Sequence, residues 1–179
     1  MLSRGIKKIT PVFMPVEVDE VRLDSAESTA IKNARLKGEC ASALTDAPVL
    51  AFDTVVGTAS SVFGKPTSRE QAVAMLKELC GKTHFVVTAV YFRVGTKIIE
   101  KSEKTFVTFG AFDKDLVYNY VDSGAPYDKA GGYNIDDAPV RALVEKIDGD
   151  YDTVVGLPVN LTENLIEENL IYGENGHCY

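Results

Sequence analysis

The stretch HFVVTAVYFRV at residues 84–94, followed by GT at 95–96 and KIIEKSEKTFVTF at 97–109, decides the fold class of this chain. Both long segments contain the β-branched and aromatic residues that favour strands. Their two-residue connection has the length and the chemistry of a hairpin turn. We therefore expect a long antiparallel hairpin.

The segments on either side of this hairpin alternate between helix and strand patterns. Further strands are expected at 48–56 and 142–147, and two prolines place the extended segment 9–18 at a sheet edge or in an irregular path. Helix-start patterns occur at Asp24, Thr67, Asp113, Asp152 and Pro158. This order predicts an α/β fold in which a mixed, curved sheet is flanked by helices.

Length and composition limit the class of protein. With 179 residues, 45% of them hydrophobic, and no linker or repeat, the chain is expected to form one domain over residues 1–179. The net charge of −7 argues against a surface dedicated to DNA or RNA. The longest apolar stretch is shorter than the roughly 20 residues of a membrane span, and no signal-peptide pattern opens the chain. Three scattered cysteines suit a reducing compartment, so we expect a cytoplasmic protein without a membrane partner.

Asp53 is the most informative single residue, because it interrupts the buried-type strand 48–56. Aspartate is disfavoured within strands, and an acid among apolar neighbours must be satisfied by specific partners. One interpretation is a structural acid bound by backbone amides. The other is a general base or a metal-ligating carboxylate at a ligand site of the sheet.

Two glycine-containing loops have weaker signals. Gly64-Lys65-Pro66 does not match a phosphate-binding P-loop, and a solvated turn explains it equally well. The loop Asp128-Lys-Ala-Gly-Gly-Tyr133 would let backbone amides approach a ligand, but paired glycines alone indicate only a bend. Neither loop decides the function by itself.

The order of the motifs is more specific than any one of them. It comprises Val18-Asp-Glu20, Ala34-Arg-Leu-Lys37, Phe52-Asp-Thr-Val-Val56, Gly64-Lys-Pro66, Leu79-Cys-Gly-Lys-Thr-His84, Asp128-Lys-Ala-Gly-Gly-Tyr133, and Ile147-Asp-Gly-Asp-Tyr151 through Val155-Gly-Leu-Pro158. This set resembles the Maf family of septum-formation-inhibitor-like nucleoside triphosphate pyrophosphatases. The resemblance implies a fold related to the inosine-triphosphate pyrophosphatase group, with two lobes around a cleft. It also implies hydrolysis of pyrimidine or modified nucleoside triphosphates to a monophosphate and pyrophosphate, a house-cleaning reaction.

The resemblance also assigns candidate roles to residues. Asp53 would activate the attacking water, and Glu20 would be the second carboxylate, so that both are candidate ligands of a divalent cation, Mg²⁺ or Mn²⁺. Lys37 and Lys65 would neutralise the phosphates. Substrate contacts would come from Thr54, Lys129 and Asp136. The chemistry is consistent, because phosphoryl transfer depends on positioning and charge neutralisation.

Two departures from the family pattern affect these expectations. The family opens with a Ser-x-Ser-Pro-Arg-Arg loop, and this chain begins just after the place where that loop would stand, so we expect an N-terminally truncated domain. The alternative function is therefore a catalytically weak nucleotide-binding regulator of cell division; a homodimer is also left open. The second departure is Asp136, where the pyrimidine-preferring branch has glutamine. An ionised aspartate only accepts hydrogen bonds, which would disfavour the O4 atom of uracil and favour a guanine-type edge.

Overall fold

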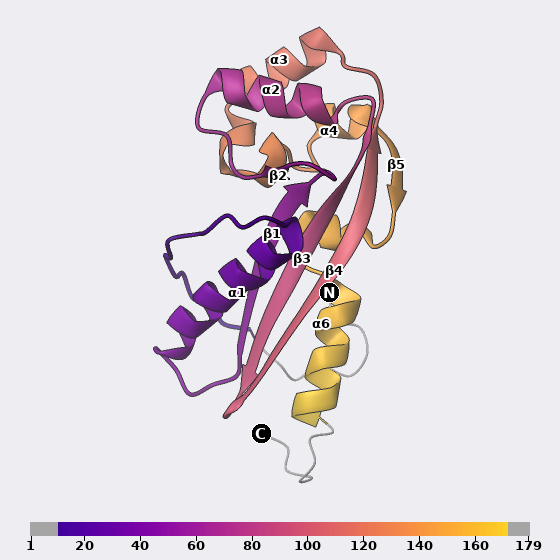
Figure 1. The fold of residues 1–179 in the computed structure, drawn as a ribbon. Helices are drawn as coiled ribbons and strands as arrows, with labels where there is room; N and C mark the ends of the chain where they lie inside the picture. Colours follow the sequence, from indigo (N-terminus) through magenta and orange to yellow (C-terminus); the bar gives the residue numbers. More distant parts are fainter. Residues whose placement is uncertain (1–10, 172–179) are drawn as a thin grey trace.

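The computed structural model describes residues 11–171 of the chain and has a five-stranded sheet at its centre. The strand order is β2 (Val62–Phe63), β1 (Val49–Gly57), β3 (Thr83–Val94), β4 (Lys97–Phe109) and β5 (Val144–Asp148). Neighbouring strands pair antiparallel throughout. An isolated parallel bridge joins Cys80 to Phe109. Figure 1 shows helices beside this sheet, so the predicted α/β fold is confirmed.

The central hairpin forms where the sequence predicts it. Val94 pairs with Lys97 across the Gly95-Thr96 turn, and the ladder continues without interruption to the pair Thr83 and Thr108. β3 also pairs along the whole length of β1. The hairpin therefore provides the long rigid surface on which the other elements pack.

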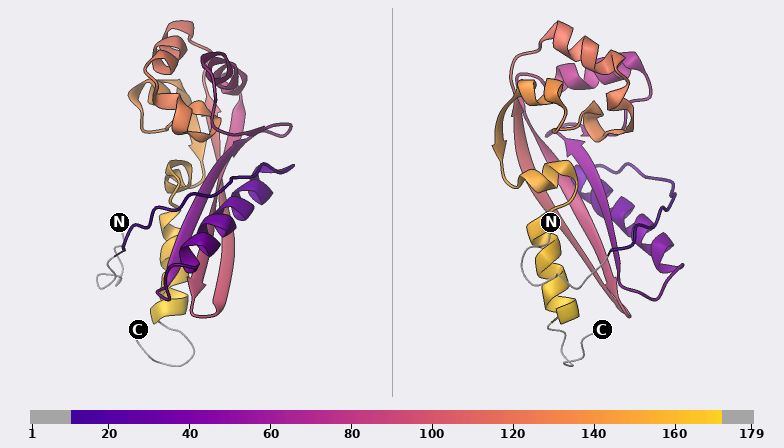
Figure 2. Two further views of the ribbon diagram at one scale, coloured as in Figure 1. Left: turned by 90° about the vertical axis from the view of Figure 1, so that its left-hand side faces the viewer. Right: turned by 180° about the vertical axis from the view of Figure 1, so that it is seen from behind.

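Two helices cover opposite faces of these long strands (Figure 2). Helix α1 (Ala26–Ser42) packs on the face that carries Val87 and Tyr91, whereas α6 (Val159–Ile166) packs on the face of Val90 and Phe92. A π-helical turn, η3 (Glu167–Ile171), continues α6. Since successive strand residues point to opposite faces, coverage of both faces explains why residues 85–92 are mostly apolar.

A close approach between α1 and β3 depends on Gly38. A Cβ atom at this position would lie 2.0 Å from the Tyr91 ring atom Cδ1, well inside van der Waals contact. Glycine therefore lets the middle of α1 lie directly on the sheet. This contact also fixes the position of Lys37, the neighbouring residue on the helix.

Most of the remaining elements form a second lobe around the other end of the sheet (Figure 1). They are α2 (Arg69–Leu79), α3 (Lys114–Asp122), α4 (Ala138–Leu143) and two short 3₁₀ turns, η1 (Ala125–Asp128) and η2 (Ala130–Gly132). Their core includes Leu76, Val117 and Val140, which pack with Phe109 of the hairpin. The short helix α5 (Tyr151–Val155) lies against the sheet between this lobe and α6 (Figure 2). Across residues 11–171, none of the helices has the length and apolar character needed to cross a membrane.

Several predicted boundaries differ from the structure by a residue or two. Ser25, not Asp24, caps α1 by accepting a hydrogen bond from the Ser28 amide, and Asp150, not Asp152, caps α5. In both cases two residues one or two positions apart can act as caps, and tertiary packing selects one. Residues 11–18 take the irregular path, and residues 9–10 lie outside the described part. The strand expected at 142–147 begins at Val144, because α4 precedes it.

Candidate functional site

A cleft of about 580 Å³ lies between the two lobes. Its walls come from the segment before α1, from α1, from β1, and from the loops that carry Lys65 and Lys129. All seven residues that the sequence singled out line it: Glu20, Lys37, Asp53, Thr54, Lys65, Lys129 and Asp136. The structure therefore brings together groups spread over more than a hundred positions of the sequence.

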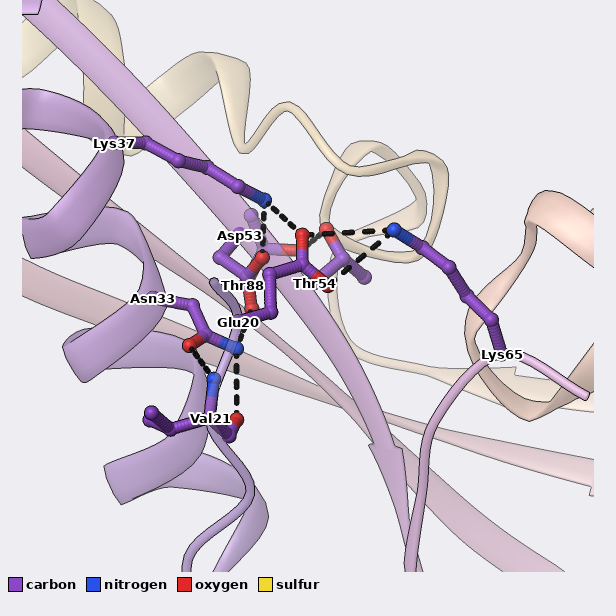
Figure 3. Close-up of polar contacts among 8 residues, drawn as sticks. All are labelled: Glu20, Val21, Asn33, Lys37, Asp53, Thr54, Lys65 and Thr88. Atoms are coloured by element: carbon purple, nitrogen blue, oxygen red, sulfur yellow. Dashed lines mark hydrogen bonds and ion pairs between the residues drawn. The ribbon is translucent and has the colours of Figure 1, made fainter. Parts of the chain in front are cut away.

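The centre of the cleft is a chain of alternating charges (Figure 3). The Lys37 ammonium lies 2.5 Å from Asp53 Oδ1 and 2.8 Å from Glu20 Oε1. The Lys65 ammonium lies 3.3 Å from Glu20 Oε2. Because the two lysines and two carboxylates alternate, each carboxylate has a cation within hydrogen-bonding distance.

The four groups differ in their contact with solvent. The Asp53 side chain is 6% exposed, whereas that of Lys65 is 53% exposed. Lys37 at 24% and Glu20 at 35% lie between them. The network thus runs from a buried acid on the sheet to an exposed cation, an arrangement that suits a ligand with a buried reacting group and a charged tail.

Burial raises the pKa of Asp53 above its usual range, although the hydrogen bond and charge of Lys37 oppose this shift. For Lys37, burial acts to lower the pKa, but the bonds to Asp53 and Glu20 prevail and the pKa is raised. Burial likewise acts to raise the pKa of Glu20, and the two lysines reverse its effect, so that this pKa is lowered. Asp53 is therefore the better proton acceptor of the two carboxylates.

Sequence reasoning missed Asn33, a buried residue that holds this network in place. Its Nδ2 group donates to the Val21 carbonyl at 3.1 Å and to Asp53 Oδ2 at 3.4 Å, and its Oδ1 atom accepts from the Val21 amide at 2.8 Å. Asn33 thereby ties the segment of Glu20 to α1 and to β1 (Figure 3). The signal was available: Asn33 and Lys37 are four apart, on one face of a helix.

The opposite wall of the cleft is built from the loop around η2. Gly131 donates its amide hydrogen to the Gly64 carbonyl at 3.0 Å, and a Cβ atom there would lie 3.0 Å from Val56. Its φ of +70° also belongs to the region that glycine prefers. The glycine thus holds the Lys65 and Lys129 loops close to β1.

Two further polar pairs lie on the same side of the cleft. Lys129 binds the neighbouring Asp128 Oδ2 at 2.6 Å, and the Tyr151 hydroxyl donates to Asp136 Oδ1 at 2.5 Å. Tyr151 belongs to α5 and was also missed by sequence reasoning. Nothing in its local sequence indicates this contact, because the two residues are 15 positions apart.

The carboxylates of the cleft bear on whether it can hold a divalent cation. Residues 11–171 contain no group of three or more His, Cys, Asp or Glu side chains arranged to hold a metal ion. Glu20 and Asp53 nevertheless both have carboxylate oxygens that can ligate a metal ion, and both carboxylates contact the Lys37 ammonium. Mg²⁺ is commonly held by one or two carboxylates together with substrate phosphates, so this pair fits a cation that binds with its substrate.

Fold and cleft together define an α/β protein with an interlobe site that suits a ligand bearing phosphate groups. The family model described as "Maf-like protein" matches residues 1–169. Because this match spans nearly the whole chain, the chain belongs to the Maf family, and the resemblance noted in the sequence is confirmed.

Individual proteins with similar sequences share a common name. A protein of Thermosipho africanus named dTTP/UTP pyrophosphatase is 47% identical over 115 residues, which are 64% of this chain and 60% of that protein. Proteins with the same name from Pyrococcus furiosus and Pseudoalteromonas translucida are 41% and 43% identical, over 85% and 75% of this chain and 80% and 71% of their own lengths. The match thus spans less than two thirds of the Thermosipho protein.

Proposed function

We propose that this chain hydrolyses nucleoside triphosphates, with dTTP, UTP and modified nucleotides as the candidate substrates, to a monophosphate and pyrophosphate. The observation that carries the proposal is the alternation of Glu20, Lys37, Asp53 and Lys65 in one cleft. The names of the relatives support the same reaction.

In the proposed reaction, Asp53 accepts a proton from a water molecule that attacks the α-phosphorus. A new bond forms between the water oxygen and this phosphorus, and the bond from the phosphorus to the oxygen bridging to the β-phosphate breaks. Pyrophosphate leaves with the bonding electrons. The raised pKa of Asp53, caused by its burial, supports this role, because a carboxylate with a raised pKa accepts a proton more readily than an ordinary aspartate.

Lys37 and Lys65 would bind the phosphate oxygens. Both ammonium groups already lie beside carboxylates, so an incoming triphosphate would compete with Glu20 for them. The exposed Lys65 can follow the β- and γ-phosphates as they enter, while Lys37 stays close to the α-phosphorus through its bond to Asp53. These cations would stabilise the charge that develops on the leaving pyrophosphate.

A divalent cation, Mg²⁺ or Mn²⁺, would be held by Glu20 and Asp53 together with the substrate. When bound, such a cation lowers the pKa of a coordinated water and neutralises phosphate charge. Glu20 has the lowered pKa expected of a ligand that stays ionised near neutral pH.

Thr54, Lys129 and Asp136 are proposed to contact the nucleoside. They line the cleft, and Thr54 is next to the proposed base in β1. A nucleotide that fills the cleft would meet these three residues as well as the four charged groups, because all of them line it. We also propose a cytoplasmic location and keep the homodimer as a further proposal, supported by the cysteine pattern and by the family resemblance respectively.

Pyrophosphate release from UTP and dTTP with Mg²⁺, measured on the wild type and on Asp53→Asn, tests the proposal. The variant should lose activity by about 10³-fold or more, because its amide cannot accept the proton. Asp122→Asn is the matched control, since Asp122 is an exposed acid on α3 that pairs with Arg69 outside the cleft. Equal activity of Asp53→Asn and the wild type would refute the role of Asp53. Nucleotide-dependent thermal stabilisation without pyrophosphate release would instead support the binding-protein alternative.

A further inference from the structure

Thr54, which lines the cleft, forms a cross-strand pair with Thr88 (Figure 3). They are direct partners in the antiparallel ladder of β1 and β3, and their Oγ1 atoms lie 2.9 Å apart. Thr54 lines the cleft, whereas Thr88 is completely buried and does not line it. Geometry alone allows either hydroxyl to donate in this pair.

A second hydrogen bond removes this ambiguity. The Thr88 Oγ1 atom also lies 2.7 Å from the backbone carbonyl oxygen of Thr153 in α5. A carbonyl oxygen has no hydrogen, and a hydroxyl has only one, so Thr88 donates its hydrogen to Thr153. Thr54 must therefore donate its own hydrogen to Thr88.

The consequence concerns what Thr54 can offer a ligand. With its hydrogen committed, the Thr54 hydroxyl presents only lone pairs to the cleft, and it acts as an acceptor. If the hydroxyl rotated to donate to a ligand, the buried Thr88 oxygen would lose its donor and Thr54 would give up an existing bond. Loss of a buried hydrogen bond is costly, so this orientation is strongly held.

We propose that Thr88, oriented by the Thr153 carbonyl, is a positioning residue that fixes Thr54 as a hydrogen-bond acceptor for the substrate base. The preferred bases are then those whose pairing edge has a ring N–H group: uracil, thymine and guanine. Cytosine and adenine present an unprotonated ring nitrogen at the equivalent place, and two acceptors would face each other. The chemical class of the ligand rests on the proposed function, whereas the assignment of the Thr54 hydroxyl as an acceptor rests on the hydrogen bonds alone.

The test compares Thr88→Val with two other variants. Thr88→Val keeps the shape of the side chain but removes the hydroxyl, so Thr54 becomes free to donate. Thr88→Ser restores a hydroxyl at the same position. Thr105→Val is the matched control, because Thr105 is an equally buried threonine on β4 that lies outside the cleft. Its hydroxyl donates at 2.8 Å to the carbonyl of Asp150, the residue that caps α5.

The readout is the ratio of kcat/KM for UTP to that for CTP, together with the ratio for GTP to ATP. In Thr88→Val both ratios should fall by about tenfold, which corresponds to one hydrogen bond of ordinary strength. Thr88→Ser and Thr105→Val should keep the wild-type ratios. A merely structural role of Thr88 would lower activity toward all four nucleotides and leave the ratios unchanged, and that result would overturn the proposal.

Binding measurements separate this inference from the proposed reaction. Calorimetric titration of UMP and CMP into the same four proteins should give the same change in preference, even if none of them releases pyrophosphate. Absence of pyrophosphate release would then count against the proposed function alone. A wild type that binds UMP and CMP equally, or a Thr88→Val variant that keeps the wild-type preference, would overturn the role of Thr88.

Discussion

The Lys37 ammonium lies 2.5 Å from Asp53 Oδ1, so the proposed base and a proposed phosphate-binding cation form an ion pair before any substrate binds. Lys37 also contacts Glu20, and burial of Asp53 makes it costly to leave this carboxylate without a partner. The pair therefore both stabilises the empty cleft and sets the protonation of Asp53.

Lys37→Met should reduce kcat/KM for the preferred nucleotide by about 10²–10³-fold, because it removes a cation next to the reacting phosphate. It should also shift the acidic limb of the pH profile to higher pH. Lys37 opposes the burial that raises the pKa of Asp53, so its loss lets this pKa rise further. Lys32→Met on the same helix, outside the cleft, is the control. If the acidic limb did not move, Lys37 would not influence the pKa of Asp53.

The sequence predicted those parts of the structure that depend on local pattern. The hairpin turn at Gly95-Thr96 was found because two residues joining two apolar strands leave few alternatives. Asp53 was found because an acid within a buried strand is conspicuous. The prediction of Asp24 as a helix cap was wrong by one residue, because Asp24 and Ser25 are both good capping side chains and local pattern does not separate them.

The parts that could not be predicted depend on contacts between distant segments. Asn33 holds Asp53 across twenty positions, and Thr88 reaches Thr153 across sixty-five. A threonine in a strand is common, and its hydrogen bonds are decided by what packs beside it. The Thr54 hydroxyl can therefore be assigned as an acceptor only when the strand register and the position of α5 are both known.

Glu20→Gln should raise the Mg²⁺ concentration needed for half-maximal pyrophosphate release by about tenfold, because it removes one of two anionic oxygen donors. The matched control is Glu17→Gln, on the same extended segment but outside the cleft. Removal of divalent cations with a chelator should abolish the activity of the wild type. If Glu20→Gln and the wild type had the same Mg²⁺ dependence, Glu20 would not be a metal ligand.

Asp136→Gln should increase the preference for UTP over GTP, by about tenfold. The carboxylate of Asp136 accepts from the Tyr151 hydroxyl through Oδ1, and its other oxygen can only accept as well. Glutamine would supply an N–H donor for the O4 atom of uracil. A nucleotide panel measures the ratio, with Asp148→Asn as a control in an exposed acid outside the cleft. An unchanged preference would exclude Asp136 from base selection.

His84 should make the stability of the fold depend on pH between 6.5 and 4. The ring is almost fully buried between Phe109 and Tyr133, its Nε2 atom lies 2.8 Å from the Tyr133 hydroxyl, and within residues 11–171 its Nδ1 atom has no hydrogen-bond partner. Burial lowers the pKa of His84 from 6.5 to about 4, so the folded state favours the neutral ring. The neutral His84 ring therefore contributes fully to the stability of the fold above pH 6.5. This contribution is lost as the pH falls toward 4, because only the unfolded chain binds the proton readily.

Between pH 7 and pH 4.5, the wild type should lose about 2 kcal/mol more unfolding free energy than His84→Gln, which cannot titrate. Urea unfolding at both pH values measures this difference. Tyr133→Phe is the control, because it keeps the histidine and its burial while removing the hydroxyl partner, and its pH dependence should match that of the wild type. Equal losses in the wild type and His84→Gln would show that His84 is not the group responsible, and the carboxylates of the cleft would then be the next to test.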